Sequence, residues 1–380
     1  MKLMSPNPGH IYLDFNASTP IAPEVRTAMA EMLAEPYGNP SSSHWAGRPA
    51  KDAIENARAQ VARLLGSKPS EVVFTSGGSE ANNHALKGVY YAANRRDAHI
   101  VTTQIEHPAL INPCRFLEKL GAHVTYLPVD ASGRVDPEDV RRALRPETVL
   151  ISVMHANNEV GTIQPIAELA EIVRGTGILL HTDAAQSIGK IACNVTELGV
   201  DLLSVAGHKL YAPKGVGALY IREGVSLEPL IHGAGHENGR RAGTENVLLN
   251  TALGVACDLA AKWVGMESVR ILRDHFWNRL CSTFGDRVVL IGHVKERLPN
   301  TLNVGFVEKV GAELLSRMPR IAASTGSACH CGSVEMSPVL RAMGIPEKTA
   351  MGAIRFSLGR GTSREEIDAV VEDLLRIVEG

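Results

Sequence analysis

The stretch Leu202-Leu203-Ser204-Val205-Ala206-Gly207-His208-Lys209 joins an apolar run of strand length to a turn that carries a lysine. The same arrangement recurs between residues 71 and 221, where each short apolar run is followed by a turn and a helical stretch. The other runs cover residues 72–74, 100–101, 124–127, 149–154, 178–181 and 218–221. Continuous apolar runs separated by helices are typical of strands buried on both faces. The pattern predicts an α/β domain with a mainly parallel, seven-stranded sheet.

The pattern of apolar residues changes after Asn246. Residues 50–65 and 165–173 have helical spacing in the first part, and Gly66 is expected to stop the first of these helices. The second part begins with a helical stretch to about Phe284 that should bend near Gly265. Four short strands (288–291, 302–306, 321–324 and 353–357) and a last helix that opens with a capping box at residues 362–366 should follow. We expect a large domain over residues 16–255 and a smaller α+β domain formed by residues 1–15 and 256–380.

Composition narrows the class of protein. The 380 residues are 44% hydrophobic and 21% charged, with a formal net charge of −2, which is ordinary for a globular domain. There is no basic excess for a nucleic-acid backbone or a membrane surface, and no apolar stretch long enough for a signal peptide or a membrane span. We therefore expect a cytoplasmic protein with small-molecule or protein partners, and with neither nucleic acid nor membrane among them.

Two polar motifs follow strands in the first part of the chain, where the nucleotide motifs GxxxxGK[ST] and GxGxxG do not occur and no HExxH is present. Thr75-Ser76-Gly77-Gly78-Ser79 opens a helix, and glycines with free N–H groups at a helix start can hold a phosphate. Asp183 ends another buried strand, at the sheet edge where ligands bind. Taken alone, the first motif is as often a tight turn, and Asp183 is more often a helix cap.

Lys209 follows a buried strand directly, which is unusual because most lysines lie on solvated faces. It is either a loop lysine that reaches water or a Schiff-base lysine. A phosphate cradle, a Schiff-base lysine and an acid for a pyridine nitrogen are together what pyridoxal 5'-phosphate (PLP) requires. His107, after another strand, could stack on the ring or could be a hydrogen-bonded loop histidine. The motifs together predict PLP.

Cys329 lies in a loop of small residues, 323–333. A cysteine there should be exposed and mobile, as a thiol nucleophile requires. The alternatives are an unreactive thiol and a metal clamp with His330 and Cys331, but these three are too close together to form a usual zinc set, and we expect no metal. The remaining cysteines are expected to be ordinary buried thiols; they are Cys114, Cys193, Cys257 and Cys281.

Arg355 lies inside an apolar strand, where its charge is costly unless it pairs with an anion. A bidentate substrate carboxylate is the anion that we expect. An internal Asp or Glu is the alternative.

These motifs, in this order and spacing, resemble those of the cysteine desulfurases and selenocysteine lyases, in the class V group of fold-type I PLP enzymes. The resemblance runs nearly end to end. It is carried by residues 12–20, 38–42, 75–83, 106–107, 157–161, 183–186, 207–209, 241–244, 326–329 and 355–357. Each motif is weak alone, and their shared order makes the signal strong.

The resemblance implies the residues that bind the cofactor ring. Lys209 would form the covalent link, Asp183 would keep the pyridine nitrogen protonated, Gln186 would face the ring hydroxyl and His107 would stack on the ring. The phosphate would be held by a separate set, Gly78, Ser79 and His208, together with Thr244 of the partner subunit. A homodimer is therefore implied.

The resemblance also implies the residues that meet the substrate. Asn158 and Arg355 would bind near or at its carboxylate, and Asn39 would be a further substrate-binding residue. Lys209 would remove the Cα proton of L-cysteine, and Cys329 would take the sulfur as a persulfide while L-alanine leaves. A sulfur or selenium acceptor protein is a possible partner.

Three features depart from the family pattern. Ala206 replaces a serine that is common two residues before the phosphate-binding histidine, so one phosphate contact should be missing. Pro108, after the stacking histidine, is at a variable position. The chain ends at Gly380, whereas some members have a longer tail that docks an iron–sulfur scaffold.

Other functions stay open at this point. A selenocysteine lyase uses the same PLP apparatus, and both His330 and the form Asp183-Ala184-Ala185-Gln186 resemble that group. An ordinary aminotransferase would not need Cys329. A non-catalytic sulfur carrier or metal-binding protein would use Cys329 and Cys331, but would have no use for Lys209 as a Schiff-base residue.

Overall fold

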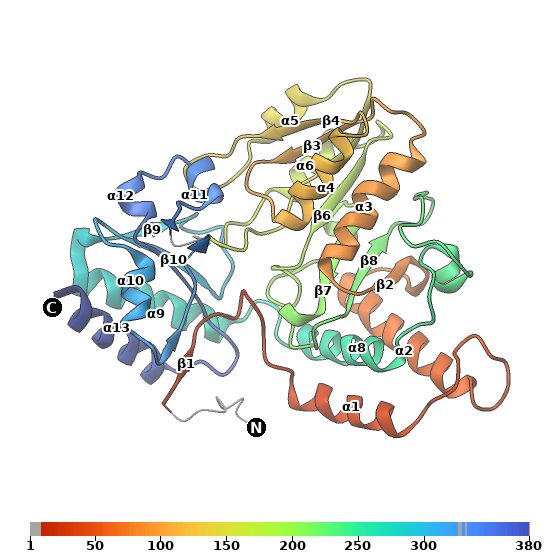
Figure 1. The fold of residues 1–380 in the computed structure, drawn as a ribbon, viewed down its shortest axis with the longest axis horizontal. Coiled ribbons are helices and arrows are strands. Elements are labelled where there is room, and N and C mark those ends of the chain that lie inside the picture. Colours follow the sequence, from red (N-terminus) through yellow and green to blue (C-terminus); the bar gives the residue numbers. More distant parts are fainter. Residues whose placement is uncertain (1–8, 326–328, 331–332, 380) are drawn as a thin grey trace.

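The computed structural model describes residues 9–325, 329–330 and 333–379 (Figure 1). Its centre is a seven-stranded sheet in the order β2-β8-β7-β6-β5-β3-β4. Only β8 is antiparallel to its neighbours; the pairs among β7, β6, β5, β3 and β4 are parallel. The strands are β2 (Val72–Thr75), β3 (His99–Thr103), β4 (His123–Leu127), β5 (Thr148–Ser152), β6 (Leu179–Asp183), β7 (Leu202–Ala206) and β8 (Gly217–Ile221). Each expected strand of this part is present, within about two residues at either end, and the predicted fold class is confirmed.

Helices cover both faces of this sheet, as continuous apolar strands require. One face packs under α2 (Arg48–Leu65), α6 (Ile166–Val173) and α8 (Val247–Ala261), and the other under α3 (Gly78–Ala92) and α4 (Pro108–Glu118). Gly66 ends α2 with a φ of 68°, in the left-handed region that favours glycine. Three more helices belong to this part: α1 (Pro23–Ala34), α5 (Pro137–Ala143) and α7 (Val195–Leu198).

A second core lies beside the first, at the left of Figure 1. It is built on a three-stranded antiparallel sheet, β14-β10-β9, packed under α9 (Glu267–Phe284) and α13 (Arg364–Glu379). Its strands are β9 (Val288–Ile291), β10 (Thr301–Phe306) and β14 (Ala353–Ser357). Shorter elements complete it: α10 (Gly311–Ser316), β11 (Ile321–Ala322), β12 (Cys329–His330), β13 (Ser333–Val334), α11 (Pro338–Ala342) and α12 (Glu347–Ala350).

The expected boundaries of this second part agree with the structure in most places. The helical stretch breaks between α8 and α9, where Gly265 has a φ of 89°. Ser363 and Glu366 form the capping box of the last helix: each side chain accepts a hydrogen bond from the backbone N–H of the other. The strand expected at 321–324 is shorter, because β11 ends at Ala322 and Ser324 forms only an isolated bridge to Arg355.

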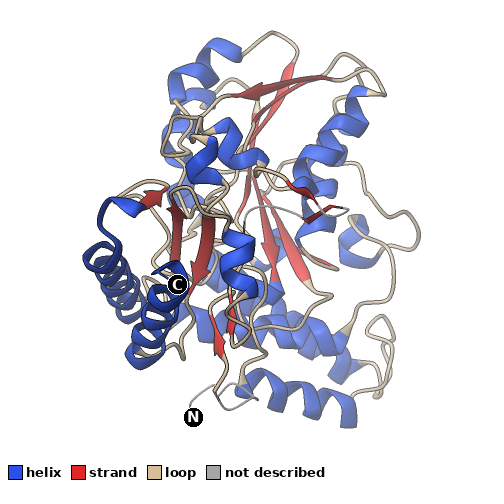
Figure 2. Cartoon of the chain, turned by 60° about the vertical axis from the view of Figure 1, so that its left-hand side comes forward, coloured by secondary structure: helices blue, strands red, loops and turns tan. Residues whose placement is uncertain are grey.

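The two cores support the proposed division into two domains, which stays a proposal. The proposed boundary at residue 255 falls inside α8, whose Cys257 and Ala260 still pack in the first core. The N-terminal segment links the two units. Leu13 belongs to the second core and Phe15 to the first, while β1 (Ile11–Tyr12) pairs with β11. Figure 2 shows the second unit against the edge of the main sheet. None of the helices in the described part of the chain could cross a membrane.

Candidate active site

A cavity of about 450 Å³ opens at the carboxyl ends of the parallel strands, where the two units meet. The strands β6 and β7, the start of α3, the turn before α4, the N-terminal segment and β14 all contribute side chains. Nine of the residues predicted from the sequence line it: Gly78, Ser79, His107, Asn158, Asp183, Gln186, His208, Lys209 and Arg355. Because parallel strands end at one edge of a sheet, residues that are far apart in the chain converge here.

Lys209 lies in the turn that follows β7. Its Nζ donates to the backbone oxygens of Asn16, at 2.5 Å, and Ala17, at 2.8 Å. Burial, with the Arg355 charge nearby, lowers the pKa of Lys209 to about 8, although Asp14 and Asp183 act in the opposite direction. About a tenth of this amine is therefore neutral and nucleophilic at pH 7, far more than for an ordinary lysine, as a Schiff-base lysine requires.

Asp183 is buried at the end of β6. Its Oδ1 accepts from the N–H of Ala185, the capping role considered above, while its Oδ2 accepts from Asn82 Nδ2 at 2.7 Å. Asn82 received no role from the sequence, although it belongs to the quoted motif and lies one helical turn after Gly78. Its Oδ1 is buried and has no hydrogen-bond partner among the described residues. The carboxylate is thus oriented within the cavity and is capable of pairing with a ring N–H.

The start of α3 forms one end of the cavity. Gly77 has a φ of 147°, and a Cβ built there meets nothing within 4 Å, whereas a Cβ on Gly78 would come within 3.2 Å of the Ala206 methyl group. His208 Nδ1 is buried and has no partner within the described part of the chain. Burial, with Lys209 nearby, lowers the pKa of His208 to about 4, so its ring is neutral at pH 7. Open space, helix N–H groups and an unused imidazole nitrogen fit a phosphate.

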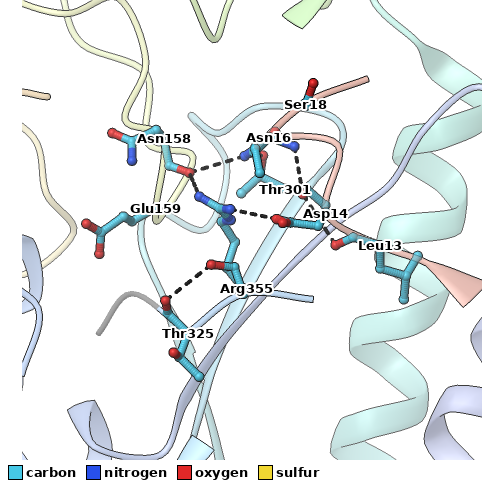
Figure 3. A network of polar contacts seen from close by, with 12 residues as sticks. Leu13, Asp14, Asn16, Ser18, Asn158, Glu159, Thr301, Thr325 and Arg355 are labelled. Atoms are coloured by element: carbon cyan, nitrogen blue, oxygen red, sulfur yellow. Dashed lines mark hydrogen bonds and ion pairs between the residues drawn. The ribbon is translucent and has the colours of Figure 1, made fainter. Parts of the chain in front are cut away.

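Arg355 reaches the cavity from β14 (Figure 3). Its Nη2 pairs with Asp14 Oδ1 at 2.7 Å, and its Nη1 donates to the backbone oxygen of Asn158 at 2.9 Å. The internal partner considered from the sequence is therefore present. Nε is buried and has no partner among the described residues, so the guanidinium keeps an unused donor. Sequence reasoning gave no role to Asp14, although it lies in the first quoted motif.

His107 begins α4 as its N-cap, and its Nδ1 accepts from the N–H of Ala109 at 3.1 Å. The preceding Glu106 is buried, with Thr103 Oγ1 donating to it at 2.8 Å and the N–H of Met154 at 3.0 and 3.1 Å. Burial raises the pKa of Glu106 to about 8. This carboxyl ties the turn that carries His107 to the loop after β5, a role that the sequence did not reveal.

Two predicted residues lie elsewhere in this chain. Asn39 lines a larger cavity of about 760 Å³, and Thr244 lines one of about 240 Å³ beside Arg241. Both cavities share Glu237 and Glu245, so they adjoin each other. Neither residue lines the cavity that contains Lys209.

The cysteines divide into two groups. Cys329 is placed only by its backbone, which pairs with Val334 in the β12–β13 ribbon; its side chain and all of Cys331 lie outside the described residues. Cys114, Cys193 and Cys257 are buried and free, as expected, and burial raises their thiol pKa values. Cys281 is half-buried. Within the described residues, no three His, Cys, Asp or Glu side chains are grouped to hold a metal.

Fold and cavity define a PLP-dependent enzyme of fold type I, and the chain matches the model of the aminotransferase class-V family over residues 11–370. Within that class it belongs to the cysteine desulfurase family. It is 49% identical over 373 residues to the cysteine desulfurase IscS of Dictyoglomus turgidum, covering 97% of this chain and 94% of the relative. It is 45% identical to the IscS of Methanosarcina thermophila, with 97% and 92% covered.

Solved structures agree with this assignment. A NifS-like protein superimposes with a TM-score of 0.91 at 37% identity, covering 97% of this chain and 99% of that one. SspA in complex with cysteine gives a TM-score of 0.82 at 38% identity, with 92% and 98% covered. The family and the PLP cofactor expected from the sequence are thereby confirmed.

Proposed function

We propose that this protein converts L-cysteine to L-alanine and transfers the sulfur to Cys329 as a persulfide. The convergence of Lys209, Asp183 and Arg355 in one cavity carries the proposal, because together they supply an amine, a carboxylate and a guanidinium for an amino-acid substrate on PLP. Relatives named cysteine desulfurase, and one solved relative with cysteine bound, support this substrate.

The residues of the cavity fit the cofactor. Gly78, Ser79 and His208 would hold the phosphate, and Asp183, oriented by Asn82, would keep the pyridine nitrogen protonated. His107 would stack on the ring, with Gln186 at the ring hydroxyl. When bound, PLP withdraws electrons from the Cα of the amino acid.

Lys209 is proposed to remove the Cα proton and later to return a proton to the product. Its low pKa suits this work, since a base near pH 8 can both take and release a proton under physiological conditions. The carbonyls of Asn16 and Ala17 hold the amine in place when it is free.

Arg355 is proposed to bind the substrate carboxylate, with Asn158 beside it. Asp14 occupies part of the guanidinium in the structure, so the carboxylate would use the free Nε or replace Asp14. Either arrangement keeps the buried charge of Arg355 paired throughout the cycle.

Cys329 is proposed to attack the substrate sulfur as a thiolate. An S–S bond forms while the C–S bond breaks, and the electron pair of that bond remains on the carbon skeleton, which takes up a proton and leaves as alanine. The position of the loop supports this role. Ser324, five residues before Cys329, exchanges backbone hydrogen bonds of 3.2 and 2.7 Å with Arg355, so the loop begins beside the cavity.

A homodimer is proposed because Thr244 lies outside the cavity that contains Lys209 in its own chain. Thr244 of the partner subunit would reach the phosphate, and Asn39 would lie at the same interface. Exposed apolar side chains on the adjoining segment, Leu33, Tyr37 and Trp45, support a covered surface there. A protein that accepts the sulfur remains part of the proposal.

Product analysis of the PLP-loaded protein tests the function. With L-cysteine and L-selenocysteine offered in parallel under a thiol reductant, we expect alanine and sulfide from L-cysteine, and loss of sulfide release in Cys329→Ala. Cys281→Ala is the matched control, because this half-buried thiol is far along the chain from every motif and should leave turnover unchanged. Selenide without sulfide would indicate a selenocysteine lyase, and full turnover by Cys329→Ala would exclude the sulfur-acceptor role.

A further inference from the structure

Lys190 is a second buried lysine close to the cofactor cavity. The residue is only 5% exposed. Nζ donates to Gln186 Oε1 at 2.9 Å and to Asn16 Oδ1 at 3.0 Å. It is not among the residues that line the cavity, so it lies behind Gln186. A lysine is rarely buried unless it is paired, yet both partners here are amide oxygens rather than carboxylates.

The contacts around Gln186 fix which end of its amide faces which neighbour. The Asn16 carbonyl only accepts, and it receives Gln186 Nε2 at 2.9 Å. The Lys190 amine donates to the opposite end, Oε1. An amide nitrogen carries two hydrogens, and only one can point at the Asn16 carbonyl. The second is available to a ligand in the cavity that Gln186 lines.

The surroundings of Lys190 favour an uncharged amine. Burial, with the Lys209 and Arg355 charges nearby, lowers the pKa of Lys190 well below its ordinary value. Two acceptors are present for its N–H groups, and both are amide oxygens. Lys190 therefore holds Gln186 Oε1 by a hydrogen bond in either protonation state.

We propose that Lys190 is a positioning residue that keeps the N–H of Gln186, and not its oxygen, directed at the ring oxygen of the bound cofactor. The inference rests on the proposed place of Gln186. An N–H donor stabilises the ionised ring oxygen, so it lowers the apparent pKa of the bound chromophore. Other charged or titratable groups in the cavity act on the same chromophore and are kept constant in the test: Lys209, Arg355, Asp183, His107 and His208.

The test is a pH titration of the visible absorbance of the PLP-loaded protein, without substrate. In Lys190→Met, which keeps the length and removes the donor, the amide of Gln186 loses one of the two contacts that fix its orientation and keeps only that of Nε2 with the Asn16 carbonyl. We expect the apparent pKa of the band to rise by about one to two pH units, the usual effect of losing a hydrogen bond to an ionised group. Gln186→Glu, which places an oxygen where the N–H was, should raise the pKa as well.

Asn300→Ala is the matched control. Asn300 Nδ2 donates to the same Asn16 Oδ1, at 3.1 Å, and to the backbone oxygen of Leu358. Among the described residues, Asn300 makes no hydrogen bond to Gln186. Its replacement should lower thermal stability and leave the apparent pKa within a few tenths of a unit. An unchanged pKa in Lys190→Met, or an equal rise in Asn300→Ala, would overturn the proposal and leave Lys190 a structural residue.

The outcome is independent of the proposed substrate. The titration uses only the bound cofactor, so a protein that binds PLP but does not convert cysteine still reports on Lys190. Conversely, if the protein desulfurates cysteine but its absorbance band has the same apparent pKa in the wild type and in Lys190→Met, the proposed function stands and the proposed role of Lys190 is wrong.

Discussion

At the scale of single residues, the main feature of the site is a group of three buried or half-buried basic side chains. Lys209, Lys190 and Arg355 lie near one another, and each is kept in place by oxygens of the N-terminal segment, residues 14–17. The pKa of both lysines is lowered by burial first and by neighbouring cations second. The segment thereby fixes where the two amines lie, while burial and the neighbouring cations shift both of them toward the neutral form.

The pKa of Lys209 gives a prediction about cofactor uptake. Only the neutral amine attacks the aldehyde of PLP, and the neutral form increases as the pH rises through a pKa of about 8. We expect the rate of PLP uptake by the apo-protein, followed by the visible band, to rise from pH 6.5, to reach half of its maximum near pH 8 and to level off about one pH unit above that. Lys209→Ala should lack the band of the lysine-linked cofactor, because it has no amine to form the link. A rate that still climbs steeply near the ordinary lysine pKa would contradict the lowered value.

At the scale of elements, the turn between β2 and α3 lies beside the end of β7, and both line one end of the cavity. Ala206 ends β7 opposite Gly78, and the contact is close enough that a side chain on Gly78 would press on its methyl group. Ala206, where the family commonly has a serine, therefore lies beside Gly78, which we propose to hold the phosphate.

Ala206→Ser tests that arrangement by gain of function. The new hydroxyl can donate to the phosphate, and one hydrogen bond to a charged group should tighten PLP binding by about tenfold. Equilibrium titration of the apo-protein with PLP measures this. Ser204→Ala is the internal contrast, since Ser204 on the same strand bonds His181 Nε2 in the interior and should change stability rather than affinity. Weaker binding by Ala206→Ser would place the phosphate elsewhere.

At the scale of the whole molecule, the cavity depends on two units and, in our proposal, on a second copy. The N-terminal segment and β14 close the side of the cavity opposite the main sheet, and Thr244 lines a separate cavity of the same chain. A monomer would then have an incomplete phosphate site.

Subunit complementation tests the shared site. Lys209→Ala should be inactive alone, and Thr244→Val, which loses one phosphate contact, should bind PLP about tenfold more weakly. The assay is therefore run at a PLP concentration that fills the wild-type site and leaves Thr244→Val mostly empty. A mixed dimer has one complete site, in which Lys209 of the Thr244→Val chain meets Thr244 of the partner subunit. Random reassortment of equal amounts should restore about a quarter of the wild-type activity, since half of the dimers are mixed and each has one working site of two. No recovery, with mixed dimers verified by mass, would mean that each chain uses its own Thr244.

The sequence alone determined the order of strands and helices in the chain, the PLP motifs and the family, because apolar periodicity and short motifs are local signals. The bend at Gly265 and the capping box at Ser363 were likewise visible, since helix ends depend on neighbouring residues. What only the tertiary structure decided is how distant groups meet. Asp14 with Arg355, Asn82 with Asp183, and Lys190 with Gln186 and Asn16 are contacts between segments. Their strength comes from burial, which no stretch of sequence displays before the chain is folded.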